Sequence, residues 1–256
     1  MTGAGPLSYR GDRMDQVSTV LIPGLLGTPR LYAEQLPALW QLGPVMVASH
    51  HHDDSVAAAA AHILSAAPPQ FALAGLSMGG YLALEIMRQA PGRVSRLALL
   101  NTSARPDTAE QAARRREQVE LARAGRFHDV VEALWQRWVR PARRGDPALR
   151  AVIRQMADET GPEGFARQQA AITGRPDSRP GLAAIRCPVL VVTGADDEIT
   201  TPEHAAEIAD GIPGARLTVL GDCGHLSALE QPAAVTLALA GWLAPPETPD
   251  LRQVRR

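Results

Sequence analysis

The stretch ALAGLSMGGY, residues 72–81, decides the fold of this chain. The apolar run Phe71 to Ala74 predicts a buried strand, and a helical pattern from Met78 to Gln89 follows it without a linker. A strand that turns into a helix within two residues strains the backbone at Ser77 and presents its side chain alone above the sheet edge. Glycines two positions before and after this serine allow the two segments to approach closely. Ser77 is therefore a candidate nucleophile.

The composition narrows the classes of protein to which the chain can belong. Its 256 residues are 45% hydrophobic, which predicts one α/β domain with an insertion, or two small domains. A net charge of −1 argues against a nucleic-acid or membrane partner. Because the chain has no lysine, Schiff-base and Ser-Lys chemistry are excluded. No apolar run is long enough for a membrane span or a signal core, and two cysteines make no disulfide framework, so we expect a cytoplasmic protein.

Strands and helices alternate along most of the chain, with a helix expected, for example, at Arg30–Trp40. This alternation predicts an α/β fold, in which helices cover both faces of a mostly parallel central sheet. The expected strands are Val17–Ile22, Val45–Ser49, Phe71–Ala74, Val94–Leu100, Val189–Gly194 and Ala215–Leu220. Residues 103–180 contain no expected strand, and their four helical stretches predict an inserted helical cap. The remaining units are an extension at 1–16, a core formed by 17–102 and 181–244, and a tail at 245–256.

A serine nucleophile needs a base that takes its proton, and the base needs an acid that orients it. In parallel sheets such sites form at the carboxyl ends of the strands. Of the seven histidines, only His225 lies in a short loop after the last expected strand. Asp196, Asp197 and Glu198 follow the preceding strand. The chain therefore offers a serine, an acid and a histidine in that order.

This order, the Gly75-Leu76-Ser77-Met78-Gly79 bend and the insertion after the next strand resemble the α/β-hydrolase family, in its serine esterase and enol-lactonase branch. The resemblance covers residues 17–243 and implies the fold of that family. It also implies that Asp197 is the acid, because Asp197 ends a Gly-x-x-Asp pattern that is typical of the family. Asp196 stays open as the alternative. In a minority of relatives the acid follows the strand after the nucleophile, but Asn101 stands there and cannot ionise.

An attacked carbonyl develops an oxyanion, which needs preorganised hydrogen-bond donors. One donor is the N–H of Met78, which follows the nucleophile at the N-terminus of a helix. The resemblance implies that the N–H of Leu25 is the second donor. Family members commonly have His-Gly-x at this loop, whereas this chain has Pro23-Gly24-Leu25, so the loop lacks the histidine that usually organises it.

The cap holds the aromatic candidates for substrate binding. Trp135 and Trp138 lie three residues apart on one helix and either pack in the core or form a hydrophobic wall over the serine. Together with Phe165 they favour a small, largely apolar acyl or alcohol group. The run His50-His51-His52-Asp53 invites a metal interpretation, but adjacent side chains point in different directions, so a solvated or site-rim segment is favoured.

These features predict a serine hydrolase that cleaves a small ester or lactone through an acyl-enzyme, with Ser77, His225 and Asp197 as its triad. We expect no metal and no organic cofactor, and the sequence does not predict an oligomeric state. Three alternatives stay open. A carbon–carbon bond hydrolase would favour a carboxylate-binding pocket, which cap arginines could supply. Perhydrolysis or haloperoxidation needs no residue beyond the triad, and a non-catalytic member would only bind a ligand.

Overall fold

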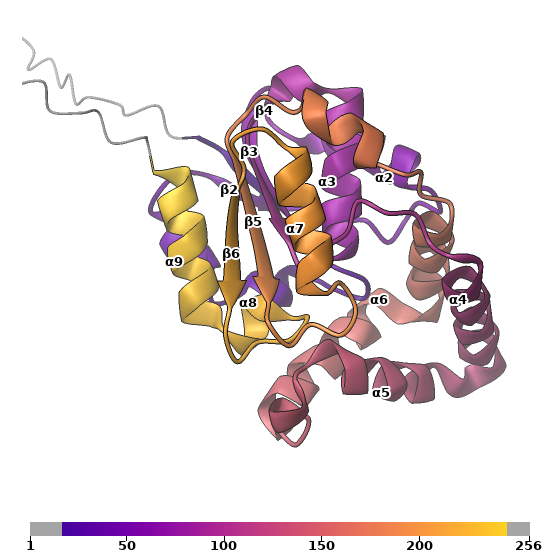
Figure 1. Ribbon diagram of the computed structural model, residues 1–256. Helices are drawn as coiled ribbons and strands as arrows, with labels where there is room; N and C mark the ends of the chain where they lie inside the picture. The colour runs from indigo at the N-terminus through magenta and orange to yellow at the C-terminus, as the bar shows by residue number, and fades with distance from the viewer. Residues whose placement is uncertain (1–16, 245–256) are drawn as a thin grey trace, which may run out of the picture.

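The computed structural model describes residues 17–244 and contains a six-stranded sheet (Figure 1). All neighbouring strands are parallel, in the order β2-β1-β3-β4-β5-β6. The expected parallel α/β sheet is therefore confirmed. The strands are β1 Thr19–Ile22, β2 Val45–Val47, β3 Phe71–Leu76, β4 Val94–Leu100, β5 Val189–Gly194 and β6 Arg216–Leu220.

Helices cover both faces of the sheet because alternate residues of a strand point to opposite sides. Val20, Leu99 and Val191 pack in one cluster with α2 (Val56–Ala66), α3 (Met78–Gln89) and α7 (Pro202–Gly211). Leu21, Leu100 and Val192 pack in the other with α1 (Leu36–Trp40) and α9 (Pro232–Leu243). A short helix, α8 (Ser227–Glu230), precedes α9.

Three helices are inserted between β4 and β5, where the sequence predicts a helical cap. They are α4 (Ala109–Leu121), α5 (Phe127–Trp138) and α6 (Pro147–Thr173), with a π turn at Ala122–Arg126 between the first two. Non-helical dihedrals at Gly161, just before Pro162, divide α6 into two parts, so the insertion has the four helical stretches that the sequence predicts. These helices lie beyond the end of the sheet to which the arrowheads of β5 and β6 point (Figure 1). That end carries the site.

One expected helix is wrong in its extent. Arg30–Trp40 is a 3-10 turn at Pro29–Tyr32 followed by the short α1, because Pro37 has no N–H to continue a helix from the preceding turn. Other 3-10 turns lie at Pro91–Arg93, Pro141–Arg143 and Arg179–Ala184. Within residues 17–244, no helix has the length and apolar character needed to span a membrane. The expected extension at 1–16 and tail at 245–256 lie outside the described residues.

Candidate active site

Ser77 stands between β3 and α3 with φ 56° and ψ −116°, a conformation that a residue with a side chain rarely adopts. The bend is crowded: a Cβ on Gly75 would strike the main chain of Gly79, and a Cβ on Gly79 would strike the carbonyl of Ile22. The N–H of Ser77 donates to the Leu100 carbonyl at 2.9 Å. Only glycine fits two positions before and two positions after this serine, so the local sequence enforces the bend that presents the hydroxyl.

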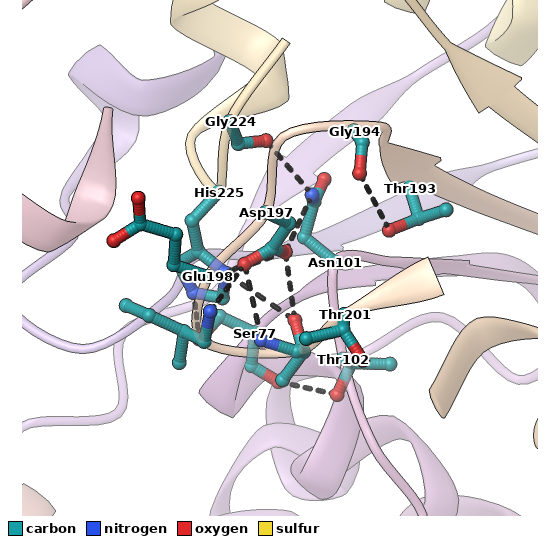
Figure 2. Close-up of polar contacts among 12 residues, drawn as sticks. Ser77, Asn101, Thr102, Thr193, Gly194, Asp197, Glu198, Thr201, Gly224 and His225 are labelled. Carbon is teal, nitrogen blue, oxygen red and sulfur yellow. Dashed lines mark hydrogen bonds and ion pairs between the residues drawn. The ribbon is translucent and has the colours of Figure 1, made fainter. Parts of the chain in front are cut away.

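His225 lies in the loop after β6 and is buried beside Ser77 (Figure 2). Its Nε2 is 2.8 Å from Ser77 Oγ, and its Nδ1 is 2.9 Å from Asp197 Oδ2. The structure thus joins the three predicted triad residues, which come from three different loops, in one hydrogen-bonded chain. With Nδ1–H donating to the carboxylate, Nε2 is free to accept the serine proton.

Asp197 is buried and its two oxygens are fully used. Oδ1 accepts from the N–H groups of Ile199 and Thr200 at 2.9 and 3.0 Å, and Oδ2 accepts from the Thr200 hydroxyl at 2.9 Å. Burial by itself raises the pKa of Asp197, but the charge and hydrogen bond of His225 and the further donors together lower it to about 2. Asp197 is therefore ionised at neutral pH. Asp196 is half exposed and pairs with Arg140 at 3.2 Å, so the alternative acid does not contact His225.

Asn101 is a site residue that the sequence did not reveal, because an amide at this position seemed only to exclude a second acid. Its Nδ2 donates to Asp197 Oδ2 at 3.0 Å and to the Gly224 carbonyl at 3.1 Å (Figure 2). It also has a positive φ of 44°. Asn101 therefore links the acid to the histidine loop, at a strained position at the end of β4.

The two expected oxyanion donors lie beside the serine. A Cβ on Gly24 would come within 3.2 Å of Ser77 Cβ, which places the Pro23–Thr28 loop against the nucleophile. Within residues 17–244, no hydrogen bond uses the N–H of Leu25 or of Met78. Met78 begins α3, and the first N–H groups of a helix have no partner inside it. Both donors are therefore free for a substrate oxygen.

His50 supports this loop in place of the missing histidine. Its Nε2–H donates to the Pro23 carbonyl at 2.9 Å, and its Nδ1 accepts from Gln168 Nε2 at 3.0 Å. Gln168, on α6, in turn accepts from the N–H of Leu26 at 3.0 Å. Burial lowers the pKa of His50 to about 4, so the ring is neutral and can both donate and accept. The histidine run thus has one buried member whose contacts are structural.

The other residues of that run do not form a metal site. Among the described residues, no group of three or more histidine, cysteine or acidic side chains is arranged to hold a metal ion. The rings of His51 and His52 lie 4.0 Å apart, and Asp53 pairs with His62 on α2. Of the predicted solvated or site-rim segment, His51 is half-buried and His52 is exposed, whereas His50 is buried.

A cavity of about 100 Å³ lies over Ser77 and His225 and is lined in part by residues of the inserted helices. Of the three aromatic candidates, only Trp138 lines it. Trp135 donates from Nε1 to the Arg144 carbonyl and is buried in the core, and Phe165 packs against Phe127. These two do not reach the cavity, so its wall is less aromatic than expected. The full lining is Leu25, Ser77, Tyr81, Gln111, Arg114, Arg115, Gln118, Leu134, Arg137, Trp138, Ile172, Ile199 and His225.

Comparisons with known proteins agree with this fold. A sequence model described as "Alpha/beta hydrolase family" matches residues 4–238. The protein named "Putative non-heme bromoperoxidase BpoC" of Mycobacterium tuberculosis is 31% identical over 188 residues, 71% of this chain and 70% of that one.

Two solved structures have the same fold. An esterase from Thermogutta terrifontis is 31% identical with a TM-score of 0.81, covering 89% of both chains. The enol-lactonase from Burkholderia xenovorans LB400 is 28% identical with a TM-score of 0.81, covering 91% of this chain and 93% of that one. Both relatives have the fold described above.

Proposed function

This chain belongs to the α/β-hydrolase family, in its esterase and enol-lactonase branch, and we propose that it hydrolyses a small ester or lactone through an acyl-enzyme on Ser77. The observation that carries the proposal is the hydrogen-bonded chain from Ser77 through His225 to Asp197. A silent, ligand-binding member would not need a strained serine aligned at 2.8 Å with a buried imidazole.

In the proposed reaction, Ser77 Oγ attacks the ester carbonyl carbon while His225 Nε2 takes the serine proton. The N–H groups of Leu25 and Met78 stabilise the oxyanion. His225 then gives its proton to the leaving alcohol as the ester C–O bond breaks, and Asp197 stabilises the imidazolium throughout. His225 Nε2 then takes a proton from water, which attacks the acyl-enzyme, and returns that proton to Ser77 Oγ as the acid is released. In a lactone, the leaving alcohol stays tethered to the acyl group throughout, and the last step releases a single hydroxy acid.

We also propose that the inserted helices act as the cap over this site. Leu134 and Trp138 of α5 line the cavity, as do four polar residues of α4. None of Ser77, His225 and Asp197 comes from this insertion, so its cavity-lining residues can set substrate preference.

Labelling with a fluorophosphonate probe tests the proposal directly. We expect the folded chain to be labelled at Ser77 and the Ser77→Ala variant to be unlabelled, with an unchanged circular dichroism spectrum. A panel of p-nitrophenyl esters of increasing chain length, run beside a lactone panel, then ranks the substrates. Absence of labelling in the folded protein would contradict the assignment of Ser77 as nucleophile.

The similarity to BpoC favours one second candidate, a perhydrolase. Hydrogen peroxide in place of water would attack the acyl-enzyme and release a peracid, which oxidises bromide to hypobromite. Bromination of monochlorodimedone in the presence of acetate, peroxide and bromide distinguishes the two. A bromination rate that exceeds the rate of ester hydrolysis would favour the perhydrolase. No bromination by a protein that cleaves esters would exclude it.

A further inference from the structure

Three guanidinium groups line the cavity over Ser77. Arg114 and Arg115 lie on α4, and Arg137 lies on α5, so the charges come from two helices. In the part of the chain that the structure describes, no aspartate or glutamate lines the same cavity. A site for a small neutral ester does not need this concentration of positive charge.

Arg115 is only partly neutralised. Its Nε donates to Asp107 at 2.7 Å, and one terminal nitrogen donates to Gln169 at 2.8 Å. Arg175 shares the same carboxylate, with a terminal nitrogen 2.7 Å from Asp107. Two arginines thus share one buried acid, which leaves a net positive charge beside the cavity. Arg115, the one cavity arginine that has an ion pair within residues 17–244, therefore still contributes positive charge to the site.

Arg114 and Arg137 make no ion pair with any carboxylate of residues 17–244. Arg137 donates to the main-chain carbonyl of Glu198 at 3.4 Å. The carboxylate of Glu198 pairs with Arg144 instead. Both cavity arginines therefore have guanidinium donors available for a bound molecule.

Resting on the hydrolase function proposed above, we propose that the substrate is an ester or lactone that carries a carboxylate, which Arg114 and Arg137 bind beside Arg115. The planar guanidinium fork matches a carboxylate with two parallel hydrogen bonds. The small cavity places any such acid group near the serine, so the substrate is a short acidic ester. The three arginines then set specificity, and Ser77, His225 and Asp197 perform the chemistry.

Matched pairs of methyl esters test this preference. Monomethyl succinate, glutarate and adipate are compared with methyl butanoate, pentanoate and hexanoate, with methanol release giving kcat/KM at pH 8. We expect the best acidic ester to exceed its neutral partner by about tenfold or more, the size of one charge-assisted contact. A neutral ester that is cleaved as well as its acidic partner in every pair would overturn the proposal.

Substitutions separate charge from shape. We expect Arg114→Gln and Arg137→Gln each to lower the acidic-to-neutral ratio by about tenfold, whereas Arg114→Lys keeps part of it. Arg116→Gln is the matched control, because Arg116 is exposed on the same helix and does not line the cavity. Arg115 is left intact since its partners Asp107 and Arg175 are buried. Equal ratios in all four variants would overturn the proposal.

A binding measurement keeps this proposal separate from the hydrolase function. Calorimetry on the Ser77→Ala chain, at low salt, compares glutarate with the neutral glutaramide and with inorganic phosphate. We expect glutarate to bind most tightly and Arg114→Gln to weaken it about tenfold. Preference for phosphate, or equal binding of glutaramide, would overturn the carboxylate assignment. Failed labelling of Ser77 would instead overturn the hydrolase function, while this measurement would still report on the arginines.

Discussion

The main-chain N–H of His225 donates a hydrogen bond to the carbonyl oxygen of Trp138, 3.1 Å away. Leu226 donates to the same oxygen at 3.1 Å. Trp138 is the last residue of α5, and the last carbonyls of a helix have no partner inside it. The loop that carries the histidine is therefore fastened to the inserted helices as well as to the sheet. A shift of α5 would move the imidazole relative to Ser77.

Glu230 is a second link between the histidine loop and the segment that follows α5. Its carboxylate accepts from the N–H of Gly224 at 3.1 Å and from the N–H of Arg140 at 2.9 Å. Because glutamine has one acceptor oxygen, Glu230→Gln would turn an N–H towards an NH₂ group. We expect a loss of about 1–3 kcal/mol in the free energy of unfolding and a lower kcat. Urea denaturation measures the free energy of unfolding, and Glu117→Gln, at an exposed position, is the control. Equal stability of the two variants would contradict the proposed link through Glu230.

Gln168 allows a test of the oxyanion loop from a distance. Replacing it with alanine removes the acceptor of the Leu26 N–H and the donor to His50, so the loop beside Leu25 loses its anchor. We expect kcat to fall roughly tenfold, less than the ~10²–10³ that follows from removal of an oxyanion donor itself. Steady-state kinetics with an ester substrate measure this fall in kcat. Gln155→Ala, on the exposed side of α6, should leave kcat unchanged, and equal rates in both variants would argue against the anchor.

The buried His50 predicts a dependence of stability on pH. Burial lowers the pKa of its imidazole to about 4 in the folded chain, below the ordinary 6.5 of the unfolded one. Between these values the unfolded chain binds the proton and the folded chain does not, so unfolding becomes easier as pH falls. The contribution is complete above pH 6.5, and on the order of 3 kcal/mol is lost by pH 4.

The measurement is the free energy of unfolding at several pH values between 7 and 4. In His50→Gln this part of the pH dependence should be absent, although the variant is less stable at pH 7. His62→Gln, exposed on α2, should keep the slope of the original chain. A slope that survives in His50→Gln would show that other groups cause it.

The features that the sequence predicted well are local ones. The bend at Ser77 is indicated by Gly75 and Gly79, two positions away on either side. Each strand is a short apolar run, so the parallel sheet and the order of its loops can be predicted from residues that are close in sequence. The supports of the site are different in kind. His50 and Gln168 are 118 residues apart, and nothing in either segment indicates that they touch. Asn101 acts through Asp197 and Gly224, which only the folded chain brings close.

The cap was harder to predict because helical periodicity does not say which neighbour each face meets. Trp135 and Trp138 are three residues apart, so their side chains differ by about 60° around the helix axis. That difference directs Trp135 into the core and Trp138 to the cavity. The cavity is also more polar than a largely apolar acyl or alcohol group would need, since Arg114 and Arg115 of α4 line it. A run of arginines on a helix does not indicate from the sequence which of them lines a cavity.

Asp197→Asn compared with Asp196→Asn tests which acid serves His225. In the Asp197 variant, the N–H groups of Ile199 and Thr200 still need an acceptor, so the amide oxygen should take the Oδ1 place. Its NH₂ would then point at His225 Nδ1, which must become an acceptor, and the ring proton would move to Nε2, opposite the serine hydroxyl. A base already protonated at Nε2 cannot take the serine proton.

We therefore expect kcat for a p-nitrophenyl ester to fall on the order of 10⁴-fold in Asp197→Asn, with the fold retained. Asp196→Asn loses only a half-exposed pair with Arg140, and its kcat should change by less than about threefold. The two variants carry the same chemical change one residue apart, which makes each the control for the other. A larger loss in Asp196→Asn would assign the acid to Asp196, against the 2.9 Å contact between Asp197 and His225.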